Sequence, residues 1–321
     1  MLNQRMMLLV NLVLFIVSFF VLVKSAEYGI KYSSKVARVF HLSEFIVSFF
    51  VVSLISCSPE ATISIISALN GIPEFGLGTL IGSNVADLAL VFGIVALFSK
   101  NGVVVKSEIL KSDLFYLVLL LVPLIVGYDG HLSQIDGIIL ILSGAIFFFT
   151  LYTQRTRFKK VFNGVHSKEW IVNFLLLIIS ICFMVVGAYY TVEYGVNLAQ
   201  DIGIPSFFIA ITLVAIGTCV PELVFSIKAV TSNHEELALG DVFGTVIIDA
   251  TFLVGILALI SPFSFNPMII YVTASMMFLA GVLVIFFLRS DKILTKNEGI
   301  YLLLFYILYL IIESIFNGRI V

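Results

Sequence analysis

Charged residues are scarce in this chain of 321 residues. Asp, Glu, Lys and Arg make up 12% of it, whereas hydrophobic residues make up 60%. Soluble domains contain about a quarter charged and about half apolar residues, so the composition excludes a soluble globular enzyme. The formal net charge is only −2, which excludes the large basic surface that nucleic acid binding needs.

Cysteine is also rare, and the three cysteines are Cys57, Cys182 and Cys219. They form no CxxC pair or other metal-binding spacing, so the sequence predicts neither a disulfide framework nor a zinc site. No HExxH, GxSxG or nucleotide-binding motif is present, which argues against an intramembrane enzyme. We expect no resident cofactor, no nucleic acid and no protein partner, and we expect the lipid bilayer and transported ions as the partners.

Long apolar runs recur along the whole chain. A helix needs about 20 apolar residues to cross a bilayer, and the runs are of that order. The sequence therefore predicts an all-α integral membrane protein with ten transmembrane helices. The ten predicted spans are 6–24, 41–69, 76–98, 113–128, 132–152, 169–195, 205–231, 237–260, 267–288 and 298–316.

The basic residues predict the orientation in the membrane. With ten spans, 15 of the 18 Lys and Arg residues fall in connections on one side, Arg5 and Arg319 fall on the other, and Lys228 lies inside a span. Cytoplasmic connections carry an excess of Lys and Arg. We therefore expect a multi-pass protein of the cell membrane with the 153–168 loop in the cytoplasm and both termini outside.

Two segments of the chain match each other without a gap at a constant offset of 162 residues. They are Ser56–Ser99 and Thr218–Ser261, and they share Pro, Glu, Gly and Asp in register. Five spans per half is an odd number, so the two halves would cross the membrane in opposite directions. Such inverted repeats are typical of secondary transporters with a midplane site on interrupted helices. The predicted organisation is a first repeat at 1–152 (core motif 55–99), a basic linker at 153–168 and a second repeat at 169–321 (core motif 217–261).

The repeated motifs carry proline, hydroxyl and carboxyl groups inside apolar helices. Pro59 and Pro221 each remove a helical hydrogen bond, and backbone freed in this way is tolerated in a membrane only where it lines a cavity. Buried acids are costly unless a cation compensates them, and Ca²⁺ takes six to eight oxygen ligands. The motif residues that would form a cage of oxygen ligands are Glu60, Ser83, Asp87, Glu222, Thr245 and Asp249. The paired glycines Gly78/Gly82 and Gly240/Gly244 indicate close helix packing.

These motifs resemble the two α-repeats of the sodium/calcium exchanger family, prokaryotic type, within the cation/Ca²⁺ antiporter superfamily. The family pattern, GTSxPE followed by GN-x-x-GS-N-x-x-[ND], is carried best by Gly217–Glu222 and Gly82–Asp87. The resemblance implies Ca²⁺/Na⁺ exchange by alternating access, with the first and sixth spans sliding over the rest. It implies that Glu60 and Glu222 are the central Ca²⁺ carboxylates. It also implies that Ser83, Asp87, Thr245 and Asp249 complete the ion sites, and that Ser56 and Thr218 offer backbone carbonyls.

The sequence departs from the family pattern at several positions. Cys57 and Cys219 replace serines, and thiol sulfur is a poor partner for Na⁺. An H⁺-coupled exchanger of Ca²⁺ or another divalent cation therefore remains an alternative, and a cation channel is a weaker one because no filter-like loop is seen. Lys228 and Asp241 have neutral counterparts in the first repeat. Lys228 either neutralises Asp241 or extends to the cytoplasmic face.

Overall fold

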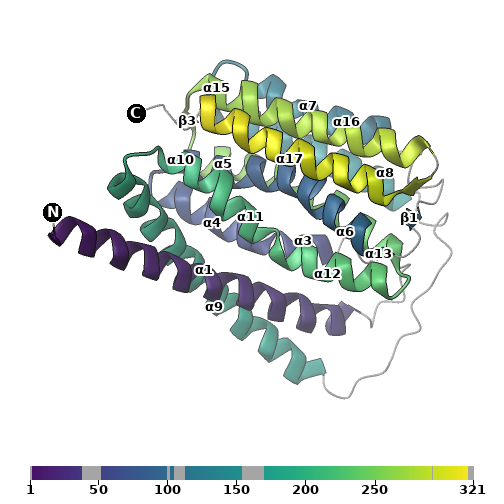
Figure 1. Cartoon of the computed structure of the whole chain (residues 1–321), viewed down its shortest axis with the longest axis horizontal. Coiled ribbons are helices and arrows are strands. Elements are labelled where there is room, and N and C mark those ends of the chain that lie inside the picture. Colours follow the sequence, from purple (N-terminus) through teal and green to yellow (C-terminus); the bar gives the residue numbers. More distant parts are fainter. Residues whose placement is uncertain are drawn as a thin grey trace.

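The computed structural model describes residues 2–37, 52–99, 102–104, 113–153, 170–290 and 292–316, and nearly all of them are helical. Figure 1 shows three groups of helices. Two long helices, α1 (Leu2–Ala37) and α9 (Trp170–Ile202), lie along one side of the molecule. Interrupted helices fill the centre, and the remaining helices cover the opposite side.

The pair α1 and α9 is antiparallel. Gly187 lies against Leu22 and the Thr191 hydroxyl donates to Ser18 Oγ at 3.4 Å. Near one end of the pair, Asn11 Nδ2 donates to Asp201 Oδ2 at 2.7 Å. Both helices continue well past the expected spans 6–24 and 169–195. Lys31 and Lys35, which lie beyond the predicted span 6–24, belong to α1 and not to a loop, because a helix satisfies its backbone internally and need not end at the membrane surface.

The central helices are interrupted at corresponding places in the two halves of the chain. A single non-helical residue follows α3 and α11, and a π-helix follows α5 and α13. The first half contributes α3 (Ser53–Ser56), α4 (Ser58–Leu69), α5 (Pro73–Val85), the π-helix η3 (Ala86–Val91) and α6 (Phe92–Phe98). The second half contributes α10 (Ser206–Ile209), the π-helix η6 (Ala210–Val214), α11 (Ala215–Thr218), α12 (Val220–Thr231), α13 (Glu235–Ile247), the π-helix η7 (Ile248–Leu253) and α14 (Val254–Ile260).

The covering helices and two short ribbons complete the described fold. The helices are α7 (Asp113–Val126), α8 (Gln134–Thr153), α15 (Pro267–Ile269), the π-helix η8 (Ile270–Ala274), α16 (Ser275–Ser290) and α17 (Lys296–Phe316). The strand β1 (Val103–Val104) pairs antiparallel with β4 (Ile293–Leu294), and β2 (His131–Leu132) pairs antiparallel with β3 (Phe263–Ser264). Each ribbon joins the two halves of the chain, and β1 and β3 lie at opposite ends of the molecule (Figure 1).

Glycine contacts repeat across the two halves. Gly93 in α6 packs against Gly299 in α17, and Gly255 in α14 packs against Gly137 in α8. A Cβ atom at any of these four glycines would lie only 2.7–2.9 Å from the carbonyl oxygen of its partner. Both positions of the second contact differ by 162 residues from those of the first. The same helix contact is therefore built twice, each time between the two halves of the chain.

Eight helical segments are long and apolar enough to cross a membrane, counted over the described residues only. The apolar helix Leu114–Val126 is shorter, and the predicted span 41–69 lies partly outside the described residues. The chain is thus a helical, multi-pass membrane protein. The eight segments are Met6–Ser25, Pro73–Phe98, Gln134–Leu151, Val172–Ile202, Ser206–Thr231, Glu235–Ile260, Pro267–Ser290 and Lys296–Phe316.

Over the residues that the structure describes, the buried apolar side chains form two separate clusters. The larger one joins the central helices to the covering helices. The smaller one holds α1 and α9 against the centre, with Phe15 and Leu22 from α1 meeting Phe75 of α5 and Val214 of η6. The α1/α9 pair therefore contacts the centre through its own apolar layer.

Candidate ion site

The site is built around two helix breaks. Cys57, with φ −73° and ψ 5°, separates α3 from α4, and Cys219, with φ −76° and ψ −3°, separates α11 from α12. Pro59 and Pro221 follow within the first turn of the next helix. Because proline has no N–H, the carbonyl four residues earlier loses its helical donor, and the Ser58 hydroxyl donates to the Ile55 carbonyl instead. The breaks expected at both prolines are confirmed, each displaced by two residues.

Five fully buried acids occupy the centre of the molecule. Glu60 and Glu222 lie in the first turns of α4 and α12, Asp87 and Asp249 in the π-helices η3 and η7, and Asp241 in α13. Within the described part of the chain, neither carboxylate oxygen of Glu60, Asp87 or Glu222 has a hydrogen-bond partner. One oxygen each of Asp241 and Asp249 is likewise without a partner there. Buried polar atoms are normally satisfied, so these oxygens are suited to an external ligand.

Hydroxyl groups tie the two halves together at the site. The Ser83 hydroxyl lies 3.1 Å from Asp249 Oδ2, as its donor, and Ser56 Oγ lies 3.0 Å from Thr245 Oγ1. The Thr218 hydroxyl is adjacent to Glu60 but donates to the Ala215 carbonyl oxygen at 3.2 Å. The structure therefore brings all four predicted hydroxyl residues next to predicted acids or next to each other.

π-helices surround two of the acids. The segments η3 and η7 each begin one residue before the acid, at Ala86 and Ile248, and each spans six residues. A π-turn spaces its hydrogen bonds five residues apart and is often found at functional sites. The wider turn rotates the acid relative to the preceding α-helix, and both halves use it at the same offset. Sequence reasoning missed it, because one widened turn leaves no pattern in a helix that is apolar on all sides.

Asp241 belongs to the site, although it was not among the predicted ion ligands. Ser56 Oγ donates to Asp241 Oδ1 at 2.9 Å, and Asp241 is fully buried. Lys228 is exposed, so the alternative in which Lys228 neutralises Asp241 is wrong. The position that corresponds to Asp241 is Thr79, whose hydroxyl donates to the Phe75 carbonyl within its own helix at 3.0 Å. The fifth acid therefore has no equivalent in the first repeat.

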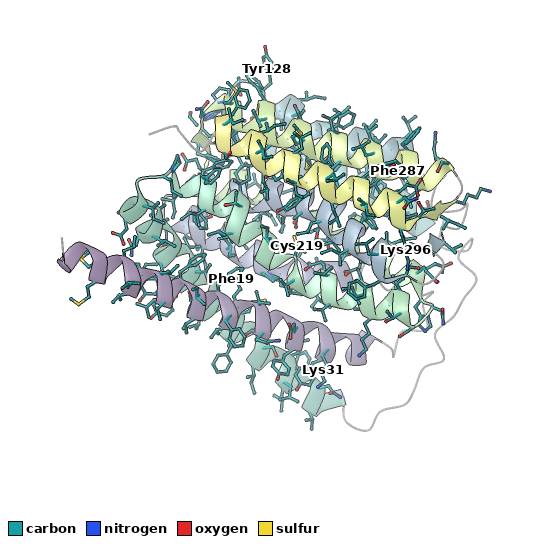
Figure 2. All side chains as sticks on the ribbon, viewed as in Figure 1. Phe19, Lys31, Tyr128, Cys219, Phe287 and Lys296 are labelled. Atoms are coloured by element: carbon teal, nitrogen blue, oxygen red, sulfur yellow. The ribbon has the colours of Figure 1, made fainter. Side chains whose placement is uncertain are left out.

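The two break cysteines lie inside the site. Both are buried, and their thiols point at backbone carbonyls at 3.4 Å, that of Cys57 at Leu54 and that of Cys219 at Ser83. Figure 2 places Cys219 at the centre of the bundle. Cys182 is exposed on α9. Among the described residues, no three His, Cys, Asp or Glu side chains converge tightly enough to hold a metal ion, so the closed cage stays a prediction.

Glycines let the helices of the site approach closely. Gly78 and Gly82 of α5 face Phe207 and Ile211, and a Cβ at Gly82 would lie 2.7 Å from the Ile211 carbonyl oxygen. The packing role expected for this pair is confirmed. At the second break, Gly217 lies directly against the ring of Phe19, a residue of α1. Figure 2 shows Phe19 between α1 and the central helices. The long helix α1 therefore covers the residues next to Thr218.

Comparison with known proteins decides the family. Residues 10–153 and 172–314 match the family model described as sodium/calcium exchanger protein. The chain belongs to this family. The resemblance inferred from the motifs is thus confirmed over both halves of this family member, and a cation/Ca²⁺ antiporter is the activity that membership supports. Two of the matched relatives are named as an exchanger and a putative antiporter, which are transporters.

Two relatives and one solved structure illustrate the match. The chain is 26% identical to sodium/calcium exchanger MaX1 of Methanosarcina acetivorans, over 95% of this chain and 99% of that protein. It is 28% identical to the inner membrane protein YrbG of Escherichia coli, over 84% and 86%. The structure of the sodium-calcium exchanger NCX_Mj soaked with 10 mM Na⁺ and 10 mM Sr²⁺ matches with a TM-score of 0.70 at 24% identity, covering 94% of this chain and 97% of that one. This last likeness supports the fold.

Proposed function

We propose that this exchanger-family protein is a secondary antiporter that exchanges Ca²⁺ for Na⁺ by alternating access. One observation carries the proposal. Two pairs of symmetry-related acids, Glu60/Glu222 and Asp87/Asp249, are fully buried around two helix breaks, and most of their oxygens lack hydrogen-bond partners within the described residues. Burying an ionised acid in a membrane without a balancing charge costs free energy. Cations that pass through the site would balance the negative charge of these acids.

The roles follow from position. Glu60 and Glu222, in the first turns of α4 and α12, are the central Ca²⁺ carboxylates. Asp87 and Asp249, with Ser83 and Thr245, complete the oxygen set, and the Ser56 and Thr218 backbone carbonyls at the breaks add neutral ligands. This donor set consists of hard oxygens, which suit Ca²⁺. Ion entry would draw together acids that do not converge on a single point in the described arrangement.

The proposed architecture has ten spans in two inverted five-helix repeats. The repeated glycine contact and the two cross-half ribbons support it. The first described residue of α1 and the last of α17 lie at the same end of the molecule (Figure 1), as an even number of spans requires. Within this architecture, α1 and α9 are the sliding helices, because they meet the centre through a separate apolar cluster.

Na⁺ is the proposed counter-ion, on the strength of the family. H⁺ is the second candidate, because a thiol at each break replaces a hydroxyl and because Asp241 adds an acid to the site. For the transported substrate, a divalent cation other than Ca²⁺ is the second candidate, because the same thiols and the additional acid change the set of ion ligands. The experiment is uptake of radiolabelled Ca²⁺ into proteoliposomes under an imposed Na⁺ gradient or an imposed pH gradient. Uptake driven by the Na⁺ gradient supports the proposal, and Ca²⁺ movement independent of both gradients contradicts it.

The proposed orientation has both termini outside and the 153–168 loop, which lies outside the described residues, in the cytoplasm. Lys31 and Lys296 lie towards one end of the molecule and Tyr128 towards the other (Figure 2), in agreement with a basic side and a non-basic side. In a variant without the three native cysteines, Tyr128→Cys should react with an impermeant thiol reagent applied outside intact cells. Lys296→Cys should not react. The reverse labelling pattern would overturn the orientation.

The sliding of α1 and α9 is testable at the Phe19 contact. A cysteine at Phe19, over the second break, should change its reactivity when Ca²⁺ is added, because α1 moves relative to Gly217. Cysteines at Ile94 in α6 and Ile256 in α14 are the matched controls and should not change. Equal, Ca²⁺-independent labelling at all three positions would contradict sliding.

A further inference from the structure

A sixth buried acid lies away from the candidate ion site. Glu313, near the end of α17, is fully buried, and the Thr273 hydroxyl of η8 donates to Glu313 Oε1 at 2.5 Å. An ionisable residue inside a transmembrane segment is a candidate functional group by default, because burying it is costly. The π-helix that carries Thr273 places this donor on the side of η8 that meets α17.

Two tyrosines continue from Glu313 along α17. Tyr309 and Tyr306 precede Glu313 by four and seven residues, so all three share one helix face. Tyr309 is fully buried and Tyr306 is 4% exposed, and their rings lie 5.6 Å apart. Over the described residues, neither tyrosine hydroxyl has a hydrogen-bond partner. Buried hydroxyls normally find one, so this row of hydroxyl groups is suited to an additional ligand such as water.

The row points towards the candidate ion site. Tyr306 lies within electrostatic range of Asp87 and Cys219, and Tyr309 within range of Glu313 and Tyr306, without a hydrogen bond between any of these pairs in the described part of the chain. Asp87 is the acid of η3, which packs against α17. The buried groups therefore form a row from Glu313 through Tyr309 and Tyr306 towards the site, with gaps between the hydroxyl groups that water molecules would have to bridge.

The repeat itself does not require this series. At the offset of 162 residues, Glu313, Tyr309 and Tyr306 correspond to Leu151, Phe147 and Gly144 of α8. Both helices make the same glycine contact with the centre, at Gly299 and Gly137. Since α8 packs in the same way with apolar residues at these positions, packing alone does not explain the polar series on α17.

We propose that Glu313 is a proton-binding site that exchanges protons with the ion site along Tyr309 and Tyr306, so that a proton accompanies cation exchange. Water molecules bridge the gaps in the row. In each step a hydroxyl or water oxygen accepts one proton and releases its own to the next oxygen, so the tyrosines and the waters return to their starting state. Thr273 is a positioning residue, which holds the Glu313 carboxyl towards the row. The inference rests on the proposed antiport and adds a coupled ion to it.

Among the described residues, few other titratable groups lie around α17. Of the elements packed against it, η3 contributes Asp87 and η8 contributes Tyr271, while α6 carries no titratable residue and α16 carries Arg289 at its far end. Cys219, at the second helix break, lies near Tyr306. Tyr271 is exposed and donates to the Tyr128 carbonyl oxygen at 3.1 Å. Glu313 is therefore the acid on this face of the described bundle outside the ion site.

The test counts protons and calcium ions in the same vesicles. Purified full-length protein is reconstituted with a pH-sensitive dye inside, and radiolabelled Ca²⁺ uptake is measured with and without Na⁺. Glu313→Gln should lower the protons moved per Ca²⁺ by at least about tenfold, because intramembrane acids serve as proton relays. Na⁺-driven Ca²⁺ uptake should stay within about twofold of the wild type, because the ion site is intact. Wild-type exchange without proton movement, or unchanged proton movement in Glu313→Gln, would overturn the inference.

Further variants separate a relay from a structural role. Glu313→Asp, which keeps the acid, should retain proton movement, and Tyr309→Phe and Thr273→Val should reduce it without changing Na⁺-driven uptake. Glu193→Gln, at an exposed acid on α9, is the control and should behave as wild type. If Glu313→Gln does not fold, unchanged proton movement in both Tyr309→Phe and Thr273→Val overturns the inference. Loss of Ca²⁺ uptake under every gradient in the wild type would instead contradict the antiporter proposal.

Discussion

The helices α8 and α17 occupy corresponding places in the two halves but differ in chemistry. Both approach the centre through a glycine, Gly137 against Gly255 and Gly299 against Gly93. Beyond that contact, α8 presents apolar residues where α17 presents Tyr306, Tyr309 and Glu313. The shared part of the two helices is therefore the scaffold, and the difference between them marks where this protein has added chemistry to it.

The same contrast holds inside the candidate ion site. Thr79 and Asp241 occupy matching positions on α5 and α13, but Thr79 bonds within its own helix whereas Asp241 accepts from Ser56 of the other half. Departures from the repeat thus occur both in the site and beside it. Variants that restore or remove the symmetry measure what each departure contributes.

The largest expected effect comes from breaking the shared scaffold. Gly93→Leu and Gly255→Leu should each lower stability, by about 1–3 kcal/mol or more, because any side chain there collides with a backbone carbonyl. The loss should be similar in the two variants, since the two contacts are equivalent. Thermal unfolding of the purified protein in detergent measures it, with Phe98→Leu and Ile260→Leu as controls at more exposed positions. A loss at only one glycine would contradict the equivalence.

A smaller effect should follow from removing the fifth acid. Asp241→Thr makes the second repeat resemble the first and should weaken apparent Ca²⁺ affinity by about tenfold, or about 1.4 kcal/mol, since it removes one carboxylate charge from the site. The concentration dependence of Ca²⁺ uptake measures the change. Thr79→Val, the matched variant on α5, should have little effect, and an equal loss in both variants would show that Asp241 has no special role.

The cross-half hydroxyl bonds should matter less. Ser83→Ala removes the donor to Asp249, and Ser56→Ala removes the donor to Asp241. Each should raise the Ca²⁺ concentration for half-maximal uptake by about threefold to tenfold, as expected when one hydrogen bond with a net value of about 0.5–1.5 kcal/mol is lost. Ser226→Ala, at a buried hydroxyl of α12 that bonds to neither acid, serves as the control. Wild-type affinity in both site variants would separate these hydroxyls from ion binding.

The smallest effect is expected at the helix breaks. Cys57→Ser and Cys219→Ser replace sulfur by oxygen at nearly constant volume, so Ca²⁺ uptake should change by less than about twofold. Its dependence on the Na⁺ gradient should be preserved or strengthened, because oxygen is the better Na⁺ ligand. Uptake under graded Na⁺ gradients measures this. Loss of Na⁺ dependence in the serine variants would contradict Na⁺ as the counter-ion.

Much of the fold and of the site could be predicted, because the repeated residues are types that are rarely tolerated inside an apolar helix without a structural or functional reason. Pro59 and Pro221 predict helix breaks wherever they stand in an apolar run, and their coincidence with Glu60 and Glu222 at a fixed offset predicts a shared site. Burial of all four paired acids next to the breaks agrees with that reasoning. Glycine contacts at Gly78 and Gly82 follow from the same logic.

Other features could not be predicted, for physical reasons. The π-helices at Asp87 and Asp249 change one turn without changing the apolar pattern of a buried helix. The hydrogen bond between Ser56 and Asp241 joins residues far apart in the chain, and no local sequence pattern predicts it. The predicted spans end before the helices α1 and α9 do, because hydropathy indicates where the chain leaves the membrane and not where the helix ends. Glu313 could have been found by extending the repeat comparison beyond 217–261, where its counterpart Leu151 is apolar.

The most direct test of the account is Ca²⁺ transport by variants of the two central acids. Glu60→Gln and Glu222→Gln preserve volume but remove one charge each from symmetry-related positions. Radiolabelled Ca²⁺ uptake into proteoliposomes under a Na⁺ gradient should fall by at least about a hundredfold in each, because a lost charge partner costs several kcal/mol. Both variants should purify as folded, monodisperse protein. Near-normal uptake in either folded variant would contradict the assignment of this site as the ion pathway.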